Sequence, residues 1–200
     1  MPDETIRIVT SDIPGESPQI EPDVPLKSER GVDYTKLRDL LATGEWKEAD
    51  RETAIKMLEV AERTKDGWLR DEDLDRFPCE DLRTIDQLWV KYSNGRFGFS
   101  VQKRIYESLG GSREYDRKIW EAFGDRVGWR VNSQWLFYEN LKFNTNKADQ
   151  GHLPTFSNGG GWLGDNVRGD RKLWGGIWSL GGNTRWNLSS LASKLVEFNI

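Results

Sequence analysis

The chain has 200 residues with a formal net charge of -4, and a length of this order suits one folded core with extensions. An acidic pI near 5.3 argues against general binding to nucleic-acid phosphates, because such binders carry a basic domain or patch. The single cysteine, Cys79, excludes an internal disulfide, and no stretch approaches the ~20 apolar residues of a membrane span. We therefore expect one cytoplasmic domain without a nucleic-acid partner or a transmembrane segment.

Both ends of the sequence differ in composition from its middle. Residues 1–30 hold most of the prolines among acidic and small residues, which favours a flexible tail or linker. Residues 157–200 alternate glycine clusters with tryptophans that either pack back on the domain or stack on a ligand, and residues 188–198 suggest a terminal helix. The expected organisation is a Pro-rich tail, a domain at residues 31–156 and a Gly/Trp-rich C-terminal extension.

The first half of the domain has a helical period. Apolar residues recur at helical spacing over residues 37–41, 46–60 and 82–92, and an acidic stretch at residues 67–77 predicts a shorter helix or a turn. Ser93, Asn94 and Gly95 then supply the residues expected at a helix end. The pattern predicts a pair of helices, a short element and a longer helix.

The second half is helical at first and then alternates. Ser100 is placed to cap a helix that includes Val101, and residues 115–123 predict another helix that ends at Gly124. From Val127 onward apolar residues alternate, and the turn at residues 132–133 suggests a small hairpin. The expected fold is mainly all-α, a compact helical bundle with long aromatic loops and a small hairpin.

Groups suited to catalysis or metal binding are few. His152 is the only histidine, and its place between Gly151 and Leu153 favours a role in a turn or cap, with hydrogen bonding or metal-complex ligation as the alternative. The carboxylates lie nearly all at helix-surface positions, which leaves no evident general acid and base pair. The sequence therefore predicts no catalytic residues, no protein-bound metal and a protein that is not an enzyme.

Residues 93–100 join two amphipathic helices by a loop of unusual composition. The loop contains two phenylalanines, two glycines and Arg96. Phe97 and Phe99 either plug the bundle or form the wall of a ligand pocket, and the two roles are compatible. Arg96, Lys103 and Arg104 supply cations near these rings, which suits a flat apolar ligand with carboxylates at its rim.

Long motifs in this region resemble the "genomes uncoupled four" domain family. The resemblance covers residues 31–154, and its most specific stretch is the SNGRFGFSVQ sequence at residues 93–102. The other matching motifs are GVDY at 31–34, WKEAD at 46–50, FP at 77–78, DLRTI at 81–85, LW at 88–89, GW at 128–129 and GHLP at 151–154.

The resemblance implies a helical domain shaped like a cupped hand, whose apolar palm binds protoporphyrin IX or its magnesium complex and, in some members, linear bilins. Such proteins are not catalysts. They stimulate magnesium chelatase in chlorophyll synthesis through its large porphyrin-binding subunit. The resemblance further implies a monomer in a cyanobacterium or other oxygenic phototroph, cytoplasmic and peripherally associated with the thylakoid membrane.

The resemblance implies a pocket that draws on the helix at residues 82–92, the start of the next helix at Val101 and an aromatic loop that holds Trp135, Tyr138, Leu141 and Phe143. Together with the residues argued above, this gives one expected set of porphyrin-binding residues. The set is Leu74, Leu88, Arg96, Phe97, Phe99, Val101, Arg104, Trp135, Tyr138, Leu141 and Phe143.

Two departures from the family pattern support a second hypothesis. Residues 155–158, after the GHLP motif, replace the leucines and arginines that close over the ligand in chelatase regulators. Asp71 falls where a regulator has an apolar residue. The alternative is a divergent sensory or protein-interaction module that keeps the fold and binds a bilin or no tetrapyrrole.

Overall fold

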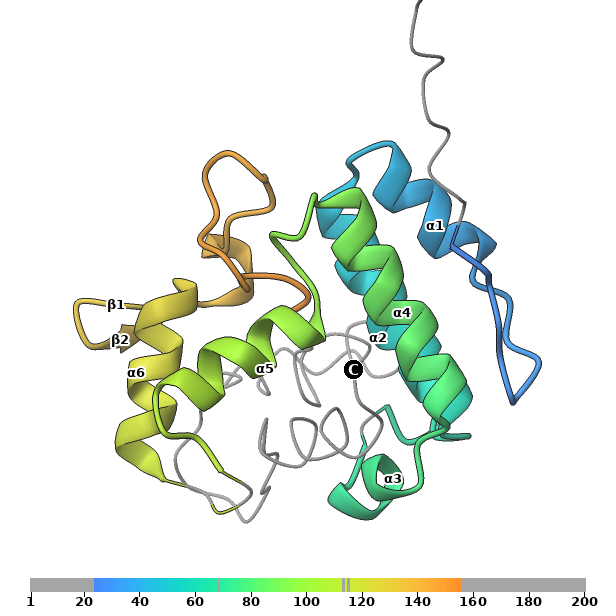
Figure 1. Ribbon diagram of the computed structural model, residues 1–200, viewed down its shortest axis with the longest axis horizontal. Helices are drawn as coiled ribbons and strands as arrows, with labels where there is room; N and C mark the ends of the chain where they lie inside the picture. The colour runs from blue at the N-terminus through green and yellow to red at the C-terminus, as the bar shows by residue number, and fades with distance from the viewer. Residues whose placement is uncertain (1–23, 68, 113, 115, 156–200) are drawn as a thin grey trace, which may run out of the picture.

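The computed structural model describes residues 24–155 except 68, 113 and 115, and about half of this part is helical (Figure 1). Its elements are α1 (Thr35–Ala42), α2 (Trp46–Val60), α3 (Asp71–Asp75), α4 (Cys79–Tyr92), α5 (Phe99–Ser108), α6 (Arg117–Val127), β1 (Arg130–Val131), β2 (Gln134–Trp135) and the 3-10 helix η1 (Tyr138–Asn140). The prediction of a mainly helical fold with a small hairpin is confirmed. The extension at 157–200 lies outside the described residues, and so does the helix expected at 188–198.

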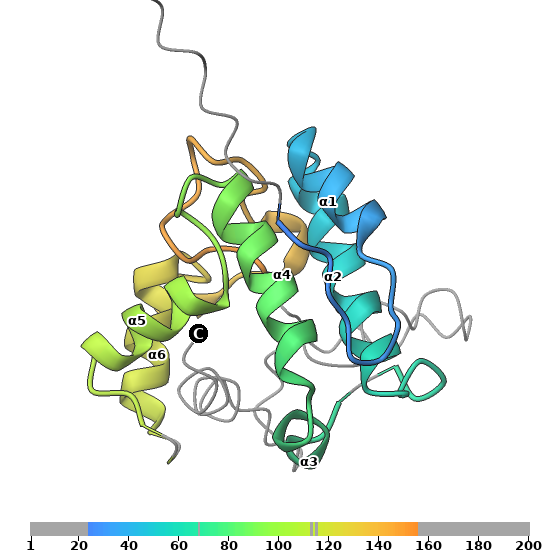
Figure 2. The ribbon, with the colours of Figure 1, turned by 45° about the vertical axis from the view of Figure 1, so that its right-hand side comes forward.

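Helices α1, α2 and α4 pack as one group, with α1 against both of the others (Figure 2). Their apolar faces share a hydrophobic cluster, called here the first cluster. Its helical members include Leu37, Leu41, Met57, Leu82, Ile85 and Leu88. Trp89, also fully buried in it, donates its indole N–H to the Thr53 hydroxyl at 2.9 Å. The largest side chain of the cluster therefore has its polar atom satisfied.

Helix α5 links this group to α6. Phe99, at the start of α5, belongs to the first cluster, whereas Tyr106, two turns later, belongs to a second cluster with Phe123, Val127 and Trp129. The rings of Tyr106 and Phe123 meet edge to face at 5.8 Å between centroids. Figure 1 shows α5 leading from α4 across to α6. One short helix thus joins two separate hydrophobic clusters.

The end of α6 differs from the prediction. We expected the helix to stop at Gly124, yet it continues to Val127 and ends at Gly128, whose φ of 75° is left-handed. The amide of Trp129 donates to the Gly124 carbonyl at 2.8 Å and closes the end of the helix. Gly124 suits this position of the helix because the aromatic ring of Trp135 occupies the space that a side chain there would fill. Val127 is therefore helical and not part of an extended segment.

The hairpin follows directly. Strands β1 and β2 pair antiparallel, with Arg130 opposite Trp135 and Val131 opposite Gln134. The two turn residues, Asn132 and Ser133, have φ values of 51° and 63°. Positive φ at both central positions is the mark of a type I′ turn, whose twist matches that of the strands.

None of the helices in the described part of the chain is long and apolar enough to cross a membrane.

A segment ahead of α1 is tied to α4 by one buried carboxylate. Asp81 is fully buried and accepts hydrogen bonds from the Ser28 hydroxyl, from the amide of Glu29 at 2.9 Å and from the Tyr34 hydroxyl at 2.8 Å. Residues from 24 onward already contact the core, since Val24 packs against the first cluster. The boundary of the tail at residue 30 stays a prediction, because residues 1–23 lie outside the described part.

Replacing Asp81 with alanine tests this anchor. We expect Asp81→Ala to lower the free energy of unfolding by about 2–4 kcal/mol, because the buried Tyr34 hydroxyl and the Glu29 amide lose their acceptor. Urea unfolding followed by tryptophan fluorescence measures the change. Asp39→Ala, on the exposed side of α1, is the control and should stay within about 0.5 kcal/mol of the parent. Equal losses in the two variants would contradict the anchor.

Candidate functional site

The loop between α4 and α5 is held by hydrogen bonds from its backbone amides to a side chain and to a distant segment. The amide of Phe97 donates to the Ser93 hydroxyl at 2.8 Å, and the amide of Gly98 donates to the Leu153 carbonyl at 3.0 Å. Gly98 has a φ of 128°, and a Cβ there would lie 2.9 Å from Oδ1 of Asp86. Only glycine fits this position without strain. The loop therefore brings the start of α5 close to Asp86 on α4.

Asp86 performs the capping that we expected of Ser100. The N-cap residue of α5 is Gly98, which has no side chain, and the buried Asp86 carboxylate accepts the Ser100 amide at 2.8 Å instead. Burial raises the pKa of Asp86, while its hydrogen bonds to the start of α5 act in the opposite direction. The cap prediction was wrong because an acceptor from a neighbouring helix, distant in sequence, replaces the local one.

The two phenylalanines of the loop are fully buried. The ring of Phe97 meets Trp46 edge to face at 5.6 Å and Trp89 at 6.3 Å between centroids. Phe99 lies in the same first cluster. Of the two roles that the sequence allows, these contacts bear out the role of a plug in the bundle.

The other apolar residues of the expected set divide between the two clusters. Leu74 and Leu88 are buried in the first cluster, against which Phe143 packs half-buried, and Trp135 and Leu141 pack half-buried against the second cluster. Val101 is buried in the first turn of α5, along the helix that links the clusters. Of these apolar side chains, Trp135, Leu141 and Phe143 keep exposed surface.

The expected cations have different surroundings. Arg96 is half-buried and binds the carbonyl of Ala148, with Nε at 3.1 Å and Nη2 also donating to it. The carbonyl of Arg96 in turn accepts the amide of Gly151 at 2.9 Å. Arg104 is exposed on α5, and Lys103 beside it is half-buried. Arg96 thus ties two loops together, whereas Arg104 presents its charge to solvent.

A polar network that sequence reasoning missed surrounds Tyr138. The hydroxyl of Tyr138 donates to Asp50 at 3.1 Å, and Thr155 donates to the same carboxylate through its amide at 2.6 Å and its hydroxyl at 2.7 Å. The ammonium of Lys47 lies 5.8 Å from the centroid of the Tyr138 ring and 5.6 Å from that of Phe143. The WKEAD motif, which holds Lys47 and Asp50, carried this signal, but its partners are about 90 and 105 residues away.

His152 is part of the framework. Its Nε2 accepts the amide of Lys142 at 3.0 Å, so Nδ1 carries the proton and donates to the Val127 carbonyl at 2.6 Å. Burial lowers the pKa of His152, which keeps the ring neutral. Trp129 donates its indole N–H to the His152 carbonyl at 2.7 Å. Both ring nitrogens are occupied, and this bears out the turn role over metal-complex ligation.

The loop after the hairpin also exposes one aromatic side chain outside the expected set. Phe137 is 56% exposed, and Val131 on β1 is 45% exposed. The sequence carried a signal for this exposed residue, because Phe137 continues the apolar run that begins at Trp135.

Within the residues that the structure describes, no group of three or more His, Cys, Asp or Glu side chains is arranged to hold a metal ion.

Comparison with known proteins gives the family. A family model described as GUN4-like matches residues 27–167, more than half of the chain. The chain belongs to the GUN4-like family. This confirms the resemblance that the motifs at residues 31–154 suggested.

Relatives of this GUN4-like chain include proteins of Porphyra purpurea, Synechocystis and Arabidopsis thaliana. It is 38% identical over 134 residues to "Uncharacterized protein ycf53" of Porphyra purpurea, covering 66% of this chain and 53% of that protein. It is 29% identical over 123 residues to "Tetrapyrrole-binding protein, chloroplastic" of Arabidopsis thaliana, covering 59% and 46%. The structure of GUN4 from Chlamydomonas reinhardtii matches with a TM-score of 0.57 at 34% identity, covering 66% of this chain and 86% of that one. The chain spans about half the length of these curated relatives.

The Asp50 network of this GUN4-like domain makes a testable link between pH and stability. Burial raises the pKa of Asp50 to about 6, above the 3.8 that is usual for an aspartate. Protonation therefore stabilises the folded state fully below about pH 4, and this contribution is lost as the pH rises through 6, by about 3 kcal/mol. Asp50→Asn removes the titration, so its stability relative to the parent should increase by about that amount between pH 4 and pH 8.

Urea unfolding at several pH values measures the difference between the two proteins. Glu121→Gln is the control of opposite sign, because hydrogen bonding to Arg117 lowers the pKa of Glu121. The contribution of Glu121 to the stability of the parent is lost as the pH falls and this carboxylate is protonated. Parallel curves for Asp50→Asn and the parent would show that Asp50 titrates alike in the folded and unfolded states.

Proposed function

We propose that this GUN4-like chain binds a tetrapyrrole, protoporphyrin IX or its magnesium complex, and carries it without transforming it. The observation that carries the proposal is the arrangement of two hydrophobic clusters joined by α5 and bordered by the half-buried Trp135, Leu141 and Phe143. Membership in the family supports it, as does the name of the Arabidopsis relative.

The chemistry of the ligand matches these side chains. A porphyrin has two flat apolar faces, which gain free energy when they are buried against aliphatic and aromatic groups. Its two propionates stay at one edge, where an exposed guanidinium such as that of Arg104 pairs with a carboxylate. A linear bilin offers the same pyrrole rings and carboxylates, so it is a second ligand of the same class.

Truncating one half-buried residue tests the site without opening the core. We expect Leu141→Ala to weaken protoporphyrin binding about tenfold, because Leu141 loses apolar contact with the ring. Leu109→Ala is the matched control, since Leu109 is also a half-buried leucine packed on the second cluster but caps the C-terminal end of α5, outside the expected set. The readouts are the Soret shift of the ligand and the quenching of tryptophan fluorescence.

Three outcomes of this titration are informative. If micromolar protoporphyrin or magnesium protoporphyrin shows no Soret shift with the parent chain and does not quench its tryptophan fluorescence, the proposal that the chain binds porphyrins is refuted. Binding of biliverdin alone would assign the site to bilins. Equal losses in Leu141→Ala and Leu109→Ala would remove Leu141 from the site.

We further propose that the chain regulates magnesium chelatase through its large subunit, as a monomer that associates peripherally with the thylakoid membrane. Family membership supports this part of the proposal. The chain spans only about half the length of its curated relatives, so a shorter fragment would represent even less of them. The assay therefore uses all 200 residues.

Adding the chain to purified magnesium chelatase should raise the rate of magnesium insertion at low protoporphyrin concentration, and Leu141→Ala should require more protein for the same effect. The rate of magnesium-protoporphyrin formation, followed by fluorescence, measures it. An unchanged rate, together with tetrapyrrole binding in the titration, would favour the alternative of a sensory or protein-interaction module.

A further inference from the structure

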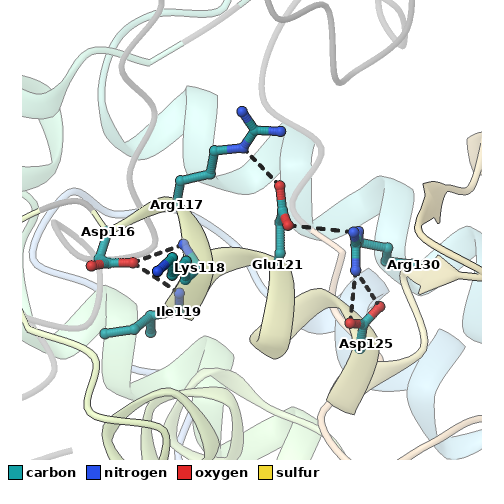
Figure 3. A network of polar contacts seen from close by, with 7 residues as sticks. All are labelled: Asp116, Arg117, Lys118, Ile119, Glu121, Asp125 and Arg130. Carbon is teal, nitrogen blue, oxygen red and sulfur yellow. Dashed lines mark hydrogen bonds and ion pairs between the residues drawn. The ribbon is translucent and has the colours of Figure 1, made fainter.

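The hairpin that precedes the aromatic loop is fixed to α6 by charge. The hairpin arm is defined as residues 129–136, in which the Leu136 amide extends the strand pairing by donating to the Trp129 carbonyl at 2.9 Å. Arg130 on β1 donates from Nη1 to both carboxylate oxygens of Asp125, at 2.9 and 2.8 Å. Its Nη2 lies 3.4 Å from Glu121. Figure 3 shows Arg130 reaching both acids on α6.

The Arg130 end of this contact is better shielded than an ordinary surface ion pair, while the Asp125 side chain is 50% exposed. The Arg130 side chain is 13% exposed, whereas Arg117, which binds the same Glu121 at 2.7 Å, is 69% exposed. A shielded pair with an oriented guanidinium is worth more than an exposed one, because less of its attraction is screened by water. Both arginines bind Glu121, but only Arg130 belongs to the arm.

A second contact fixes the arm by shape. A Cβ at Gly124 of α6 would lie well inside van der Waals contact with Cζ3 and Cη2 of Trp135, so the indole lies directly on the backbone of the helix. Trp120, one turn earlier on α6, stacks with Trp135 at 5.8 Å between centroids and an interplanar angle of 30°. Trp135 is held between a glycine without a side chain and a neighbouring indole.

We propose that Gly124 and Arg130 are positioning residues for the tetrapyrrole site, which dock the hairpin arm on α6 so that the aromatic loop from Trp135 to Phe143 is formed before the ligand arrives. This inference rests on the proposed function. A loop that is ordered in advance loses less conformational entropy when the ligand binds, so its affinity is higher. In this proposal the aromatic loop is a preformed wall of the site and not a flap that folds over the ligand.

Gly124→Ala is the decisive variant, because it should disturb the docking of the arm without destabilising α6. Alanine is a better helix former than glycine, so α6 itself should be maintained. The added methyl group has to displace the Trp135 indole from its seat. Arg130→Gln removes the charged contact independently, and Arg117→Gln is its control, since it removes an ion pair to the same Glu121 without touching the arm.

The full chain and each variant are titrated with protoporphyrin IX, and the near-ultraviolet circular dichroism of the free proteins reports the Trp120–Trp135 pair. We expect both Gly124→Ala and Arg130→Gln to change the tryptophan signal and to weaken binding about tenfold. Arg117→Gln should leave both readouts at the parent values. The Soret-region circular dichroism of the bound ligand should also change in the two arm variants, since it depends on the aromatic rings nearby.

A double-variant cycle distinguishes positioning from general damage. In a Trp135→Phe background the smaller ring leaves room for the methyl group, so Gly124→Ala should have little further effect on affinity. A full additional loss in that background would overturn the proposal. So would parent affinity in Gly124→Ala with a changed tryptophan signal. If the parent chain binds no tetrapyrrole, the proposed function itself fails, and it fails for every variant alike.

Discussion

The fold depends on where the ring of Phe97 packs. Phe97 lies edge-on to Trp46 of α2 and to Trp89 of α4, so the loop after α4 is fixed to two helices at once. Because Phe99 follows two residues later and is buried in the same cluster, the direction in which α5 leaves is set by the loop and not by the helix itself. The second cluster, with α6 and the hairpin, is then built on the far end of α5. One aromatic contact thereby determines how the two hydrophobic clusters are arranged.

Buried aspartates connect the remaining segments to this frame. Asp81 holds the segment ahead of α1, Asp86 holds the start of α5, and Asp50 holds Tyr138 and Thr155. In each case a helix supplies the carboxylate and another segment of the chain supplies the N–H or O–H donors, which satisfies polar groups that have no partner within their own element. Burial raises the pKa values of Asp50 and Asp86, so these contacts are obtained at a cost in charge desolvation.

The sequence is sufficient to predict the elements but not the contacts between them. The places of α1, α2 and α4 along the chain follow from apolar spacing, although α1 and α4 begin two and three residues earlier than expected, and the hairpin follows from Asn132 and Ser133. Two local predictions were wrong, at Ser100 and at Gly124. At Ser100 the acceptor comes from Asp86 on another helix, and at Gly124 the glycine makes room for the ring of Trp135 and does not end the helix. The Asp50 network escaped prediction because its partners are about 90 and 105 residues away.

The division between buried and half-buried residues decides which side chains are able to meet a ligand. Leu88, Phe97 and Phe99 have no exposed surface, so they shape a binding surface from beneath, and their substitution would damage the core first. Leu141 and Phe143 retain surface and rest on different clusters. A flat ligand in contact with both would be supported from two sides by groups whose relative positions are already fixed. Affinity would then depend on the contacts that hold the loop in place as much as on the residues that touch the ring.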